Sequence, residues 1–117
     1  MGALTIYHNP KCSKSREALA LLEGRGLKPR IVRYLENPPT AAELVEIVRK
    51  LGIRPEQLVR TGEDVYKAKF AGRTLGDEEW IAAMVENPVL IERPIVVSGT
   101  RAVIGRPPEQ VSALLDN

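Results

Sequence analysis

The chain has 117 residues, of which 44% are hydrophobic, and this length fits one domain of the commonest size. Seventeen basic and fifteen acidic residues give a net charge of +2, which is too balanced to indicate nucleic-acid binding. One cysteine excludes an internal disulfide, and one histidine argues against a Cys/His zinc site. We therefore expect a single domain over residues 1–117, with no bound metal and no nucleic-acid partner.

The N-terminal sequence has no signal-peptide pattern, and no apolar stretch is long enough to span a membrane. A lone cysteine without a disulfide partner is typical of a reducing compartment. The composition therefore predicts a soluble cytoplasmic protein without a membrane partner, and we expect it to be a monomer.

The first third of the chain predicts a strand, a helix and a second strand. Residues 4–7 are typical of a short buried strand, and residues 13–24 carry apolar side chains at helical spacing. Gly24 and Gly26 indicate the end of that helix. Residues 30–35 predict the second strand, and a right-handed crossover makes the two strands parallel.

The middle of the chain predicts a block of helices. Thr40 and Glu43 have the spacing of a capping box, and Gly52 follows the last apolar position of that helix. The expected elements are a helix from Thr40 to Gly52, a turn around 55–59, a short helix at 63–70 and a helix from Asp77 to Asn87. The block therefore forms an insertion between the second strand and the rest of the sheet.

The last third predicts two strands and a helix. Residues 94–98 and 101–105 are strand-like, and Gly99-Thr100 suits a two-residue hairpin turn. Pro107-Pro108 is typical of a first helical turn, and the apolar residues that would pack this last helix are Val111, Leu114 and Leu115. The order of elements predicts an α/β (α+β) protein with a thioredoxin-like, mixed four-stranded sheet.

Cys12 lies where the first strand is expected to give way to the first helix. The unpaired backbone N–H groups and the dipole of a helix N-terminus favour a negative charge, and Lys11, Lys14 and Arg16 add positive potential. A lone cysteine is most often a small buried hydrophobe, but these polar and basic neighbours argue against burial. We therefore interpret Cys12 as a nucleophilic or redox cysteine beside an anion site.

Three arginines lie at the ends of predicted elements. Arg93 precedes Pro94 and Arg106 precedes Pro107, and a residue before proline is held extended, so its side chain has a defined direction. Arg60 closes a short turn. Converging guanidiniums bind a tetrahedral oxyanion through paired hydrogen bonds, whereas the alternative for each arginine is a solvated surface charge.

In a thioredoxin-like sheet, the loop before the third strand faces the cysteine loop, and its proline is usually cis. We therefore expect a cis Arg93–Pro94 peptide bond, with Arg93 facing the Cys12 loop.

Several segments carry a family resemblance along nearly the whole chain: Ile6–Pro10, Cys12 with Ser15-Arg16, Tyr34–Pro39, Leu58–Arg60, Ile91–Val97 and Gly105–Pro107. With these segments the chain resembles the ArsC family of glutaredoxin-coupled arsenate reductases, and in particular its short arsenate-reductase-like relatives.

The resemblance implies roles for particular residues. Cys12 matches the nucleophile, and His8 matches a histidine thought to assist its ionisation. The positions that hold the oxyanion and stabilise the arsenic adduct are Arg60, Arg93 and Arg106. The residues with structural roles at the site are Asn9, Ser15 and Pro94. The alternative for His8 is a strand-end histidine bonded to the backbone, and the sequence leaves both interpretations open.

The resemblance also implies arsenate or a similar oxyanion as substrate, glutathione as co-substrate, glutaredoxin as electron donor and no bound cofactor. Since Cys12 is the only cysteine, the remaining thiols would come from those partners. Two other functions fit the same fold: a thiol-redox protein that acts on glutathionylated substrates, and an Spx-like transcriptional regulator. Such regulators usually carry a Cys-x-x-Cys switch, which Cys12-Ser13-Lys14-Ser15 does not provide.

Overall fold

The computed structural model describes residues 4–115. The chain divides into two compact units, which we call the sheet unit (residues 1–37 and 93–117) and the helical unit (residues 38–92). The helical unit is thus the insertion expected between the second and third strands. That the whole chain behaves as one domain remains a prediction.

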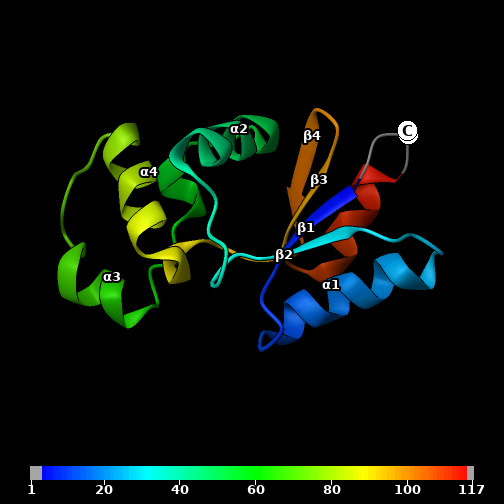
Figure 1. The fold of residues 1–117 in the computed structure, drawn as a ribbon. Helices are drawn as coiled ribbons and strands as arrows, with labels where there is room; N and C mark the ends of the chain where they lie inside the picture. The colour runs from blue at the N-terminus through cyan, green and yellow to red at the C-terminus, as the bar shows by residue number, and fades with distance from the viewer. Residues whose placement is uncertain (1–3, 116–117) are drawn as a thin grey trace. The chain divides into compact units, whose positions relative to one another are not determined.

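The sheet unit contains four strands in the order β2-β1-β3-β4 (Figure 1). β1 is parallel to β2 and antiparallel to β3, and β3 pairs antiparallel with β4. The elements of this unit are β1 (Leu4–His8), α1 (Ser13–Gly24), β2 (Arg30–Arg33), β3 (Ile95–Ser98), β4 (Arg101–Ile104) and the 3-10 helix η3 (Pro108–Leu114). The predicted parallel pair, the Gly99-Thr100 hairpin and the mixed four-stranded sheet are confirmed.

The core of the sheet unit lies between the sheet and the two helices α1 and η3. Leu4 and Ile6 project from one face of β1, as alternate residues of a strand do, and they pack with Ala18 and Leu22 of α1. The remaining buried members of this cluster are Val96, Val111 and Leu114. Burial of each large aliphatic side chain stabilises the fold by about 1.5–3 kcal/mol. This packing fixes the N-terminus of α1 beside the end of β1.

Two elements of the sheet unit differ from the sequence prediction. β2 ends at Arg33 rather than at residue 35, because the backbone N–H groups of Glu36 and Asn37 both donate to the Arg33 carbonyl and form a turn. The last helix is a 3-10 helix. Its buried residues Pro108, Val111 and Leu114 are three positions apart, which matches three residues per turn.

The helical unit is built on the predicted capping signals. The Thr40 hydroxyl accepts from the Glu43 backbone N–H at 3.1 Å, and Gly52 ends the helix in the left-handed conformation at φ 71°. The elements are α2 (Ala41–Leu51), η1 (Pro55–Leu58), α3 (Asp64–Lys69), α4 (Asp77–Glu86) and η2 (Pro88–Leu90), with η1 and η2 being 3-10 helices. No helix within residues 4–115 has the length and apolar character that crossing a membrane requires.

α4 organises the helical unit. It packs against α2, η1 and η2, and its Trp80 is buried. Tyr66 and Phe70, at α3 and its end, lie against the Trp80 ring with centroids 6.2 and 5.8 Å away. Val59 and Ile91 form an isolated antiparallel bridge, so the segments before Glu92 and after η1 run side by side.

Gly105, directly after β4, lies in a place where the structure leaves no room for a larger side chain. A Cβ at this position would lie 2.9 Å from Pro94 Cγ and 3.2 Å from Val111 Cγ1. We expect Gly105→Ala to lower the free energy of unfolding by about 1–3 kcal/mol, as overpacked cores do. Urea unfolding measures this, with Gly24→Ala as the control because a Cβ there meets no atom within 4 Å. Equal stability of the two variants would contradict the contact.

Candidate active site

The loop between β1 and α1 is shaped by Asn9. Its side-chain Oδ1 accepts the Lys11 backbone N–H at 3.0 Å, and its carbonyl accepts the Cys12 N–H at 3.0 Å. Cys12 is the N-cap of α1, with extended backbone angles of φ −95° and ψ 124°. The structure therefore confirms the predicted place of Cys12 at the strand–helix junction.

The Cys12 sulfur lies among hydrogen-bond donors. Partial burial disfavours the thiolate, but the backbone N–H groups of Ser15 and Lys14 and the Arg93 guanidinium stabilise it. Together these donors outweigh the burial and lower the pKa of the Cys12 thiol below its ordinary value. The surroundings of Cys12 therefore favour the thiolate form of its side chain.

This environment predicts the pH dependence of alkylation. Because the thiolate is the reactive form, the rate of Cys12 alkylation by iodoacetamide should fall as pH drops through the lowered pKa. We expect the midpoint to lie below the free-thiol value of about 8.5. Stopped-flow alkylation from pH 5 to 10 measures it, with glutathione alkylated in parallel. A midpoint equal to or above that of glutathione would refute the proposed environment.

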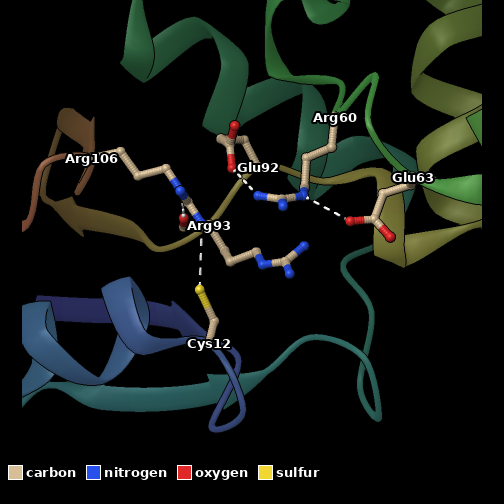
Figure 2. A network of polar contacts seen from close by, with 6 residues as sticks. All are labelled: Cys12, Arg60, Glu63, Glu92, Arg93 and Arg106. Atoms are coloured by element: carbon tan, nitrogen blue, oxygen red, sulfur yellow. Dashed lines mark hydrogen bonds and ion pairs between the residues drawn. The ribbon is translucent and has the colours of Figure 1, made fainter.

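Arg106 joins the end of β4 to the cysteine loop (Figure 2). Its Nη2 donates to Cys12 Sγ at 3.4 Å, and its Nε donates to the Arg93 carbonyl at 2.8 Å. The Arg93–Pro94 peptide bond is cis, and the Arg93 guanidinium lies close enough to Cys12 to lower the pKa of its thiol, so both predictions about Arg93 are confirmed. The Arg106–Pro107 bond is also cis, which the sequence analysis did not predict.

Arg60 belongs to the helical unit and is held by two carboxylates (Figure 2). Its Nε donates to Glu63 at 3.1 Å, and its Nη1 donates to Glu92 at 2.6 Å. Burial disfavours the charged guanidinium, but the two carboxylates raise the pKa of Arg60 above its ordinary value. That Arg60 also holds the oxyanion remains a prediction.

The sequence analysis missed Glu63 and Glu92 as partners of Arg60. Glu63 is three residues after Arg60, but Arg60 lies before α3 and outside any helix, so the helical spacing rule does not indicate this pair. Glu92 lies 32 residues from Arg60, and only folding brings them together.

His8 bonds to a side chain rather than to the backbone. Its Nδ1 lies 2.7 Å from Ser15 Oγ, which also accepts the Asn9 backbone N–H at 3.0 Å. Burial is the main cause that lowers the pKa of His8, and the positive charges of Arg33 and Arg16 lower it further. The lowered pKa favours the neutral imidazole, and that His8 assists the ionisation of Cys12 remains a prediction.

The sheet unit thus combines a stabilised thiolate with guanidiniums that approach the same sulfur. Arg93 and Arg106 can both bond an anion through paired N–H groups, and the sulfur can attack the central atom of that anion. Within residues 4–115, no group of three or more His, Cys, Asp or Glu side chains is placed to hold a metal ion. The arrangement favours thiolate chemistry on a tetrahedral oxyanion.

Known proteins match this chain along almost its whole length. The model of the ArsC family matches residues 7–114. YfgD of Escherichia coli K12, named an uncharacterized protein, is 53% identical over 91% of each chain. The arsenate reductase of Haemophilus influenzae is 47% identical, covering 97% of this chain and 99% of its own. A solved structure of an arsenate reductase from Vibrio cholerae has a TM-score of 0.92 at 48% identity, covering 96% of this chain and 97% of that one. The fold is thioredoxin-like, and the chain belongs to the ArsC family.

Proposed function

We propose that the protein reduces arsenate to arsenite through its Cys12 thiol. The observation that carries this proposal is the place of the Cys12 sulfur at a helix N-terminus, where Arg106 donates a hydrogen bond to it and the Arg93 guanidinium lowers the pKa of its thiol. Arsenate is a tetrahedral oxyanion of the kind such a cluster binds. The relatives from Haemophilus influenzae and Vibrio cholerae are named arsenate reductases, which supports the same substrate.

The first step is attack of the Cys12 thiolate on arsenic. A sulfur–arsenic bond forms, an arsenic–oxygen bond breaks and hydroxide leaves. Arg93 and Arg106 stabilise the charge on the remaining oxygens, because guanidinium groups make strong hydrogen bonds to anions. The donors that lower the pKa of Cys12 increase the fraction of thiolate, the attacking form, relative to an ordinary thiol at the same pH.

The electrons come from other thiols. Cys12 is the only cysteine, so this chain cannot form an internal disulfide. A glutathione thiolate attacks the Cys12 sulfur of the adduct, the sulfur–arsenic bond breaks with its electron pair remaining on arsenic, and arsenite leaves. The two thiols are thereby oxidised to a Cys12–glutathione disulfide, which glutaredoxin then reduces. Glutathione is thus a co-substrate and glutaredoxin a protein partner in this proposal, and the reaction takes place in the cytoplasm.

The test is steady-state arsenite formation by the purified protein. With arsenate, glutathione, glutaredoxin and glutathione reductase with NADPH, we expect arsenite at a rate proportional to protein concentration. Omission of glutaredoxin or of glutathione should reduce that rate to background. No arsenite in the complete mixture would refute the proposal. Reduction of a glutathionylated test protein under the same conditions would then favour the thiol-redox alternative.

A further inference from the structure

Charge is distributed unevenly between the two units of the chain. The sheet unit, which carries Cys12, contains ten Lys and Arg residues against five Asp and Glu. The helical unit contains seven against ten. The small net charge of +2 is therefore the sum of a basic sheet unit, which carries Cys12, and an acidic helical unit. The electrostatic field of the basic sheet unit attracts acidic molecules.

Several of these basic side chains lie at the Cys12 end of the sheet. His8 at the end of β1 pairs with Arg33 at the end of β2, so Arg33 lies at the same end as the cysteine loop. The positive charges of Arg33 and Arg16 both act on His8, which places them near that end. Lys11, Arg16 and Arg33 are exposed, so their charges face solvent.

β2 forms an open edge of the sheet (Figure 1). Within the described residues its one neighbouring strand is β1, and Arg30, Ile31 and Arg33 are exposed. A hollow of about 570 Å³ runs along this edge, lined by Arg30–Arg33 and Asn37. Ile31 and the following Leu35 are each 45% exposed, which is unusual for large aliphatic side chains of this chain. We call Arg30–Arg33 with Asn37 the β2 edge.

The β2 edge has the features of a strand-addition site. An unpaired edge offers backbone N–H and C=O groups to an extended segment, and flanking side chains determine which segment binds. Here the flanking charges are two arginines. Arg33 also contacts Glu36 at 3.9 Å, but that pair is exposed on both sides and leaves the edge basic.

We propose that the β2 edge docks an acidic, extended segment of the dithiol protein that reduces Cys12. This proposal rests on the proposed function in one respect: the proposed reaction needs a thiol from another molecule to reduce Cys12. The lone cysteine demands a protein or small thiol from elsewhere, and the basic side chains beside Cys12 favour an acidic one. Arg30 and Arg33 then orient the partner so that its thiol reaches the cysteine loop.

The step that follows docking is thiol–disulfide exchange. A thiolate of the dithiol partner attacks the glutathione sulfur of the Cys12–glutathione disulfide, and the Cys12 thiolate leaves. The partner's second thiol loses its proton to water and displaces glutathione as a thiolate. The partner dithiol is thereby oxidised to a disulfide by two electrons, and the Cys12–glutathione disulfide is reduced.

The experiment measures this exchange without arsenate. Oxidised glutathione converts Cys12 to its mixed disulfide with release of one glutathione, and stopped-flow mixing with a purified dithiol glutaredoxin then gives the second-order rate constant. We expect Arg30→Glu with Arg33→Glu to lower that constant at least tenfold at low salt. In the wild-type protein, added NaCl should lower it steeply, and in the double variant much less.

A matched control reverses two exposed arginines of the same unit, Arg25→Glu with Arg101→Glu. Arg25 follows the C-terminus of α1, and Arg101 pairs with Ser98, which pairs with Leu4 at the start of β1. Both therefore lie at the end of the sheet unit away from Cys12, and this double variant should keep at least half of the wild-type constant. Equal losses in the two double variants would overturn the proposal, as would an unchanged constant in the β2-edge variant.

Reduction of the same mixed disulfide by dithiothreitol, a small dithiol with no protein segment to dock, shows whether the substitutions change the reactivity of the Cys12 disulfide itself. We expect the β2-edge variant and the wild-type protein to react with dithiothreitol at equal rates, and a matching loss there would overturn the docking role. Because no arsenate is present, the outcome stands whether or not the protein reduces arsenate.

Discussion

Cys12→Ser is expected to abolish arsenite formation, with kcat/KM for arsenate falling by at least about 10³-fold. A serine hydroxyl is not ionised near neutral pH, so the donors around position 12 have no thiolate to stabilise. It also forms no disulfide, so glutathione and glutaredoxin cannot complete the cycle. The measurement is arsenite production over time in the complete reaction mixture.

Ser13→Ala is the matched control for this substitution. Ser13 is the exposed first residue of α1, next to Cys12. The proposed mechanism assigns its hydroxyl no function at the Cys12 sulfur. We expect this variant to retain wild-type activity and Cys12→Ser to unfold in urea at nearly the wild-type concentration. A folded Cys12→Ser protein with a tenth or more of wild-type activity would exclude Cys12 as the nucleophile.

Arg93→Ala and Arg106→Ala are each expected to lower kcat/KM for arsenate by roughly 10- to 150-fold. This range corresponds to the loss of about 1.5–3 kcal/mol from hydrogen bonds that involve charged groups. Arg106→Ala removes the 3.4 Å bond to Cys12 Sγ and the 2.8 Å bond to the Arg93 carbonyl, so it should also raise the pKa of Cys12. Steady-state kinetics and the alkylation profile measure the two effects.

Arg93→Lys should recover only part of the activity, because an ammonium group cannot make the paired contact of a guanidinium. Sulfate and phosphate should compete with arsenate in the wild-type protein and more weakly in the alanine variants. Arg25→Ala, at the far end of the sheet unit, controls for loss of positive charge. Near wild-type kcat/KM in Arg93→Ala and Arg106→Ala would exclude an oxyanion clamp built from these side chains.

Most of the fold followed from local signals in the sequence. The capping box at Thr40, the left-handed Gly52 and the Gly99-Thr100 turn set element ends through contacts between near neighbours. The place of Cys12 at the start of α1 also followed from a strand that breaks before a helical pattern. Such features are readable because few residues, close in sequence, determine them.

The geometry of the candidate site depends on contacts between distant segments. Arg106 and Cys12 are 94 positions apart in the sequence, and Glu92 and Arg60 are 32 positions apart. No local sequence pattern could therefore predict either hydrogen bond. The 3-10 form of η3 arises where Val111 and Leu114 meet the core. The sequence therefore determined the elements and the candidate residues, whereas side-chain partners and the environment of the thiol depended on how the chain packs, because burial and hydrogen bonding are properties of the folded molecule.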